Sequence, residues 1–455
     1  NNFILGFWKG NLLTKLSYLI MGVGHVFRGK TVKGIIYFVL QISFIMYFIT
    51  FGGGILNMFF VNFFTGGTLG LNETYISDKW DDSLGAFPVV PGDNSFHILL
   101  YGVLSICIII FFIVVYFASI RESVSLEELR IIGKKADGIK KEASMLLDSK
   151  FHNSLLTLPL IGLFMFTVIP LITMILVAFT NYDASHEVPS KLFSWVGFQN
   201  FFELFSGKTA LGATFIRVLM WTLIWAFMAT FTNYFGGMIL AILINKKGIK
   251  FKKFFRTCFV ATIAVPQFVS LLLMSKMLDP DGIISVMLNS VFGISLKFGL
   301  DIATTRICII LVNMWVGVPY SMLICSGILM NIPADLYESA KIDGSKPFRT
   351  YMRITLPYML FVTGPYLITQ FIGNLNNFNL IYLLSGGGPG DLLKYTDGAK
   401  GTDLLITWLY KLSIGVDRNY KLASVIGILV FILSAVFSLL VYNRSSAVKK
   451  EGDFQ

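Results

Sequence analysis

The polar stretch PADLYESAKIDGSKPFRTYMRITLP, at residues 333–357, lies between two long apolar segments. Pro333 suits the first turn of a helix, and Gly344 is placed to end that helix. Ser345 is a suitable cap for a second helix, which Pro347 would open. The stretch therefore predicts a bent pair of short helices. On these residues alone, the simpler interpretation is a solvated connection between two apolar segments.

The apolar segments on both sides of this stretch extend through most of the chain. Hydrophobic residues make up 55% of the 455 positions and charged residues only 14%, against about 25% in an ordinary soluble protein. A helix needs roughly 20 apolar residues to cross about 30 Å of hydrocarbon. The expected fold class is therefore an all-α membrane protein with eight transmembrane helices. The expected spans are residues 33–51, 96–118, 154–180, 218–245, 257–278, 307–330, 358–384 and 422–442.

The distribution of basic residues predicts the orientation of these spans. Lys and Arg are retained on the cytoplasmic side during insertion. With the N-terminus inside, most of the 37 Lys and Arg residues fall in inner connections. We therefore expect both termini, and residues 333–357, on the cytoplasmic side. The net charge of +11 fits this topology better than it fits nucleic-acid binding, because the charges are scattered over short inner loops.

The same pattern divides the chain into three expected parts. Residues 1–118 would hold an N-terminal interfacial segment and two accessory transmembrane helices. Residues 119–152 would form a basic cytoplasmic linker. Residues 153–455 would form a core of six transmembrane helices, with the polar stretch as its cytoplasmic loop at 331–357. The chain is thus expected to cross the cell membrane many times.

The expected spans lack the groups that ion-driven pumps and membrane enzymes need. No Asp, Glu, Lys or Arg lies in the central part of any span, although such groups normally mark proton and ion pathways. Catalysis would also require a placed acid, base or nucleophile. No Walker A pattern occurs in the sequence. We expect no catalytic or metal site, and active transport would need energy from another chain.

Uncharged polar residues remain inside the spans. Amides donate and accept hydrogen bonds without a charge to desolvate, so they suit a neutral ligand rich in hydroxyl groups. The alternative, which the residues leave equally open, is that these side chains hydrogen-bond one helix to another. The residues are Gln267, Asn313, Tyr320, Gln370, Asn374, Asn376, Asn377 and Asn379.

The polar stretch carries the motif of a known family. The spacing of Glu338-Ser-Ala340, Gly344 and Leu356-Pro357 resembles the EAA loop of importer-type ABC permeases. The resemblance implies that this loop is a coupling helix, which inserts into an ATP-binding subunit and transmits its closure to the spans. The residues expected at that contact are Glu338, Ser339, Ala340, Asp343 and Gly344, of which Ser339 stands where the family has Ala.

Further motifs are similar to the carbohydrate branch of this family. They are Gly386-Gly-Gly-Pro389, the run NNFNLIY at 376–382 and TDLL at 402–405. The pattern resembles permeases of the MalF type, which transport maltose and maltodextrin, over roughly residues 155–442. It implies the type I ABC importer permease fold.

The resemblance also implies a function and a set of partners. The chain would take up oligosaccharides with a second permease subunit of the MalG type, two ATPase subunits and an extracellular solute-binding protein, in the lipid membrane of a bacterium. It would bind no cofactor itself, since ATP and Mg²⁺ would be held by the ATPase, and no nucleic acid. One alternative is an ABC permease for another neutral polar solute. A less favoured one is an ion-coupled secondary transporter.

In permeases of this type the sugar rests midway across the membrane, and the matching motifs place its contacts in two spans. Asn313, Gly317 and Tyr320 match in the sixth expected span. Asn374 and Asn377 match in the seventh. The amides and the tyrosine would hydrogen-bond sugar hydroxyls, and the glycine would leave room beside the sugar ring.

Four positions depart from the family pattern. Where the family has Tyr, Ser, Ser and Phe, this chain has Ile263, Gln267, Gln370 and Gly373. The loss of an aromatic ring at Gly373 would widen the pocket and weaken stacking on the sugar. The two glutamines would add longer amide arms. We therefore expect a different or larger oligosaccharide than maltose.

Overall fold

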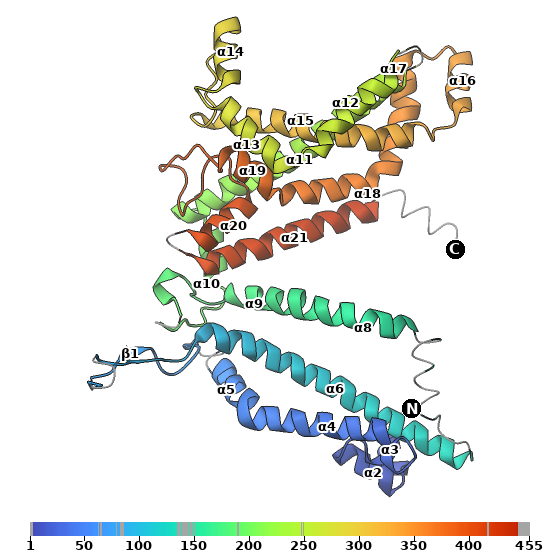
Figure 1. The fold of residues 1–455 in the computed structure, drawn as a ribbon, viewed down its shortest axis with the longest axis vertical. Coiled ribbons are helices and arrows are strands. Elements are labelled where there is room, and N and C mark those ends of the chain that lie inside the picture. The colour runs from blue at the N-terminus through green and yellow to red at the C-terminus, as the bar shows by residue number, and fades with distance from the viewer. Residues whose placement is uncertain are drawn as a thin grey trace. The chain divides into compact units, whose positions relative to one another are not determined.

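Two compact helical units, Asn1–Gly197 and Phe198–Gln455, make up the chain (Figure 1). The computed structural model describes residues 3–444, apart from 62, 64–65, 79, 82–85, 134–137, 139–143, 145–147, 149–150, 189–190, 247, 249 and 416–417. Much of the expected linker at 119–152 therefore lies outside the described residues. The three expected parts of the chain stay a prediction.

Three apolar spans and a small β-hairpin form the first unit. The spans are Thr31–Phe60, Ser95–Ile131 and Leu155–Val177. Single π-helical turns, η1 (Phe48–Gly52) and η2 (Phe164–Val168), lie within the first and third spans. The other helices are α1 (Phe3–Lys9), α2 (Leu12–Leu19), α3 (Val23–Val26), α4 (Thr31–Tyr47), α5 (Gly53–Val61), α6 (Ser95–Ile131), α8 (Phe151–Leu163), α9 (Ile169–Val177) and the short η3 (Ala184–His186), and strands β1 (Tyr75–Ile76) and β2 (Val89–Val90) pair antiparallel.

Polar contacts attach the N-terminal helices to the end of α6. The Glu122 carboxylate accepts a hydrogen bond from Lys33 at 2.6 Å. The Arg28 side chain, which is only 2% exposed, donates to the Ser123 carbonyl at 2.7 Å. Pairing of this kind offsets the cost of removing charges from water. It explains how a charged N-terminal segment packs closely on an apolar span.

The second unit contains the polar stretch and the remaining spans. Figure 1 shows α16 and α17 at one end of this unit, and α10 and α14 at the other. Its helices are α10 (Gln199–Phe205), α11 (Ala210–Asn245), α12 (Lys252–Ala264), α13 (Gln267–Leu278), α14 (Ile283–Phe292), α15 (Ile302–Leu329), α16 (Ala334–Ile342), α17 (Pro347–Thr350), η4 (Tyr351–Thr355), α18 (Leu356–Leu375), α19 (Phe378–Ser385), α20 (Leu405–Ile414) and α21 (Tyr420–Arg444).

Small residues let α11 and α15 pack closely along each other. A Cβ atom at Gly237 would lie 2.5 Å from the Cβ of Ser321, so only glycine permits this approach. Close backbone contact matters here because lipid offers no hydrophobic drive for helices to associate. Two buried clusters follow along the pair. One includes Trp225, Leu271, Ile309 and Leu380, and the other includes Tyr234, Met238, Met322 and Met359.

The structure confirms the prediction of an all-helical protein with many apolar helices. Within the described residues, six helices are long and apolar enough to cross a membrane, and α12 with α13 would add a seventh as one bent span. The expected span at 358–384 corresponds to α18 and α19, which break apart after Leu375. Helix α18 is not among the six spans. The count of eight therefore stays a prediction, as does the orientation.

The polar stretch forms the bent helix pair that the sequence predicts. Helix α16 begins after Pro333, and Gly344 takes the left-handed φ of +69° just beyond its end. The prediction that Ser345 caps the next helix is wrong. Lys346 occupies the cap position without a side-chain cap, and Ser345 Oγ instead accepts a hydrogen bond from Thr350 at 3.1 Å.

Candidate functional site

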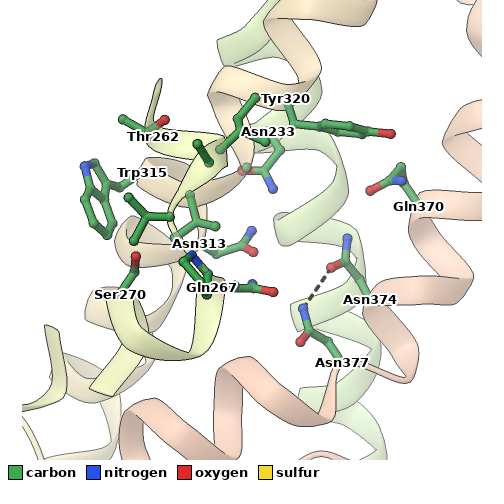
Figure 2. Close-up of a pocket in the computed structure, with 16 residues that line it drawn as sticks. Asn233, Thr262, Gln267, Ser270, Asn313, Trp315, Tyr320, Gln370, Asn374 and Asn377 are labelled. Atoms are coloured by element: carbon green, nitrogen blue, oxygen red, sulfur yellow. Dashed lines mark hydrogen bonds between the residues drawn. The ribbon is translucent and has the colours of Figure 1, made fainter. Parts of the chain in front are cut away.

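A cavity of about 490 Å³ lies within the second unit (Figure 2). Helices α11, α15 and α18 and the break between α12 and α13 supply its walls. Along α11 and α15, its lining residues fall between the two buried clusters. Its volume is in the range of about 300–1,000 Å³ that is typical of small-molecule sites. The cavity is therefore large enough for a small molecule and lies between the two buried clusters along α11 and α15.

The break between α12 and α13 forms one wall of this cavity. The two helices meet at an angle of 91° around Val265 and Pro266. Proline has no N–H to continue the helical ladder, and it disfavours helical backbone in the residue before it. The break therefore brings backbone polar groups and the side chain of Gln267 to the cavity. Non-helical backbone at this depth is tolerated where it lines a cavity.

Three predicted asparagines line the cavity and also join helices. Asn313 Nδ2 donates to the Ala229 carbonyl of α11 at 3.4 Å. Asn374 Nδ2 donates to Thr230 Oγ1 of α11 at 3.0 Å. Asn377 Nδ2 donates to Asn374 Oδ1 at 3.4 Å, as Figure 2 shows. The helix-joining interpretation is therefore confirmed for Asn313 and Asn374, and binding of a ligand by these residues stays a prediction.

The remaining predicted residues divide into two groups. Gln267, Gly317, Tyr320 and Gln370 line the cavity with the three asparagines. The cavity lining does not include Gly373, which lies one position before Asn374 on α18, and a Cβ atom there would meet no atom within 4 Å. The structure therefore brings together seven of the eight expected contacts. The expected widening at Gly373 stays a prediction.

Sequence reasoning missed three polar residues of the lining. Asn233 comes from α11, Thr262 from the end of α12, and Ser270 from the first turns of α13. None belongs to a motif that we matched. Asn233 is nevertheless visible in the sequence as an amide within the apolar run FTNYFGG at 231–237.

The chemistry of the lining suits a neutral polar ligand. Among the described lining residues there is no charged side chain. The described residues also contain no group of three or more side chains suited to hold a metal ion. The polar side chains are Asn233, Thr262, Gln267, Ser270, Asn313, Trp315, Tyr320, Gln370, Asn374 and Asn377.

The expected coupling residues lie on the exposed helix α16 and the turn after it. Glu338, Ser339, Asp343 and Gly344 are exposed, and Ala340 is partly buried. The adjoining apolar side chain of Ile342 is 86% exposed. The Tyr337 hydroxyl shares a hydrogen bond of 3.0 Å with Thr355 Oγ1, directly before α18. This contact connects α16 to the start of a cavity-lining helix.

An uncharged cavity among apolar spans, connected to an exposed helix, is consistent with a multi-pass membrane permease. Comparisons with known proteins agree. The family model described as "Binding-protein-dependent transport system inner membrane component" matches residues 233–449. The galactooligosaccharides transport system permease protein GanP of Bacillus subtilis is 34% identical over 439 residues, which cover 96% of this chain and 98% of GanP. The maltodextrin transport system permease protein MalC of Streptococcus pneumoniae is 32% identical over 453 residues, which cover 96% of each chain.

A solved structure shares the fold. It is a bacterial alginate ABC transporter in complex with an alginate pentasaccharide-bound periplasmic protein. One of its chains aligns with a TM-score of 0.54 and 21% identity, over 68% of this chain and 98% of that one. This chain therefore belongs to the family of binding-protein-dependent inner membrane permeases, with the type I ABC permease fold and a MalF-like sequence.

Proposed function

We propose that this chain is the transmembrane subunit through which an ATP-driven importer takes up a neutral oligosaccharide. The observation that carries the proposal is the cavity, because its described lining is rich in amides and has no charged group. Amides match sugar hydroxyls, which both donate and accept hydrogen bonds. The relatives named for galactooligosaccharide and maltodextrin transport support the same class of substrate.

The proposal includes the expected partners and topology. An extracellular solute-binding protein delivers the sugar, and a second permease subunit completes the pathway. Two ATPase subunits hold ATP and Mg²⁺ and contact α16 through the exposed residues around Glu338 and Gly344. Eight helices cross the membrane, with both termini in the cytoplasm. The exposed position of α16, and its contact with the start of α18, support this coupling role.

The substrate that we propose is larger than maltose, or differs from it in linkage. Gln267 and Gln370 line the cavity with long amide arms. The proposal keeps the expectation that Gly373, which lies next to the lining residue Asn374 and outside the lining itself, offers the sugar no aromatic ring for stacking.

The test is uptake by the complete importer reconstituted in proteoliposomes. Vesicles are loaded with ATP and Mg²⁺, supplied with the binding protein, and offered labelled maltoheptaose or a labelled galactooligosaccharide. We expect uptake of at least one of these sugars only with ATP inside. Uptake that persists without ATP and follows an imposed proton gradient would overturn the proposal. ATP-driven uptake of a non-sugar solute, with neither sugar accepted, would overturn the substrate class alone.

A further inference from the structure

Asn233 differs from the asparagines that join helices in the cavity. Its side-chain oxygen, Oδ1, is buried and has no hydrogen-bond partner among the described residues. Asn313 and Asn374, by contrast, each donate to α11. A buried amide oxygen without a partner costs free energy, so native proteins keep few of them without a reason. Asn233 Oδ1 makes no hydrogen bond to a neighbouring helix among the described residues, so helix packing does not explain why this oxygen is buried.

Gly317 is what makes room for Asn233. A Cβ atom at position 317 would lie 2.1 Å from Asn233 Nδ2 and 2.7 Å from its Cγ. The helices are already close at this level, because a Cβ at Gly236 would lie 2.9 Å from Val318. A side chain at residue 317 would therefore displace the Asn233 amide from its position against α15. The sequence predicts that Gly317 leaves room beside the sugar. In the structure, Gly317 leaves room for the Asn233 amide.

Both residues face the cavity. Gly317 and Asn233 belong to the same lining as Tyr320 and Gln370. Figure 2 shows Asn233 near Tyr320, with Gln370 and Asn374 of α18 across the open space. The last torsion of an asparagine side chain is broad and roughly two-fold, so either end of the amide is able to turn toward a ligand.

We propose that Asn233 is a further sugar-contacting residue that helps to determine specificity, and that Gly317 acts as its positioning partner. The inference rests on the proposed function and deepens it. When an oligosaccharide occupies the cavity, one of its hydroxyl groups donates to Oδ1 of Asn233, and Nδ2 donates to a second sugar oxygen. The ligand thus satisfies an amide that the protein leaves unpaired. Sugars without a hydroxyl at that position are discriminated against, because they leave the amide unpaired.

The first experiment compares two variants of the same chemistry on the same helix. In the complete importer, Asn233→Leu removes the cavity amide while keeping its size. The matched control is Asn245→Leu, which removes an amide of α11 that hydrogen-bonds Ser326 Oγ at 2.7 Å and does not line the cavity. ATP-driven uptake is measured against maltotriose, maltoheptaose and a galactooligosaccharide, with the amount of inserted protein determined for each variant.

The expected result is a shift in apparent affinity and preference for Asn233→Leu alone. Loss of a hydrogen bond inside such a site predicts an increase in KM of about tenfold, unequal among the three sugars. The control should keep the wild-type KM values and the wild-type ratios between sugars. Equal KM values and ratios for Asn233→Leu and wild type would overturn the inference while leaving the proposed function intact. An inactive wild type would instead count against the proposed function.

A double-mutant cycle tests the link to Gly317 independently of that result. Gly317→Ala should weaken sugar uptake in the wild-type background, because the new methyl group displaces the Asn233 amide. In the Asn233→Ala background, the same change should have little further effect, since there is no amide left to displace. Fully additive effects on KM would show that residue 317 contacts the sugar by itself, and would refute its positioning role.

Discussion

The cavity and the proposed coupling helix α16 belong to the same unit but differ in exposure and charge. The cavity has no charged side chain in its described lining and is built from parts of α11, α12, α13, α15 and α18. Helix α16 is one continuous and largely exposed segment that carries Asp335, Glu338 and Lys341. An uncharged cavity suits a neutral solute, because charges at that depth would be costly. An exposed charged helix suits a protein partner in water.

The contact between Tyr337 and Thr355 is where these two regions meet. Thr355 is 5% exposed and directly precedes α18, which supplies Gln370 and Asn374 to the cavity. A movement of α16 would therefore reach α18 without passing through a flexible loop. Changes in α16 should therefore affect how ATP hydrolysis drives transport, and changes in the cavity should affect which sugar is transported. Four experiments test this difference.

The largest effect is expected for Gly344→Pro. Gly344 has a φ of +69° and donates its N–H to the Lys341 carbonyl at 3.1 Å. Proline has φ near −65° and no N–H, so the end of α16 should distort. ATP-driven uptake should fall by about a hundredfold, with the amount of inserted protein unchanged.

The control for this prediction is Gly293→Pro, at the end of α14. Gly293 has a φ of +66° and donates to the Asn289 carbonyl at 2.9 Å, so the local damage is the same. Uptake by this control should exceed that of Gly344→Pro. Equal losses from the two changes would mean that α16 has no special role in driving transport.

The next largest effect is expected from a charge in the cavity. Gln370→Glu places a carboxylate in a lining that has no charged group among its described residues. Uptake of neutral oligosaccharides should fall by about tenfold or more, because an unpaired charge at this depth is costly. Uptake by the Gln370→Met variant, which loses the amide without gaining a charge, should fall less. A Met variant as impaired as the Glu variant would show that charge is not what the cavity avoids.

Removal of the contact between the regions should have a moderate effect. Tyr337→Phe deletes the 3.0 Å hydrogen bond to Thr355. The ratio of sugar molecules imported to ATP molecules hydrolysed should fall about two- to tenfold, while the KM for sugar stays constant. Tyr358→Phe, also near the start of α18, is the control and should leave the ratio unchanged. A change in the KM for sugar with an unchanged ratio would mean that Tyr337 affects sugar binding and not the coupling of transport to ATP hydrolysis.

The smallest effect is expected for Gly373→Phe. The space around Gly373 is open, so a phenylalanine should fit without disturbing the fold. An added ring should offer a stacking surface to short sugars and raise uptake of maltose severalfold relative to maltoheptaose. An unchanged preference between these two sugars would contradict the proposed role of Gly373.

The difference between the two regions also explains which features of the structure the sequence predicts and which it does not. Helix α16 and its bend follow from Pro333, Gly344 and Pro347, because capping and turn preferences act between neighbours in the chain. The cap at Ser345 was wrong because Thr350, five residues later, supplies a competing partner. Local rules therefore succeed for α16 except where a second contact intervenes.

The cavity depends on distances that no local rule supplies. Five of its residues were found because they match motifs that resemble a known family, and Gln267 and Gln370 were found as amides within apolar segments, at positions that depart from the family pattern. Asn233 was missed because its importance comes from its approach to Gly317, more than eighty residues away in the chain. The break at Pro266 was missed for a related reason. A proline near the middle of an apolar segment is compatible with a kinked span, and packing decides whether it bends by 91°.

The most direct test of the central claim is to locate the sugar on this chain during transport. The complete importer is supplied with a photoreactive maltodextrin derivative, illuminated during ATP-driven uptake, and digested for mass spectrometry. We predict ATP-dependent labelling of peptides that contain residues 262–270, 313–320 and 370–377, suppressed by excess unlabelled maltodextrin. Uptake that proceeds with labelling confined to other parts of the chain would contradict the account.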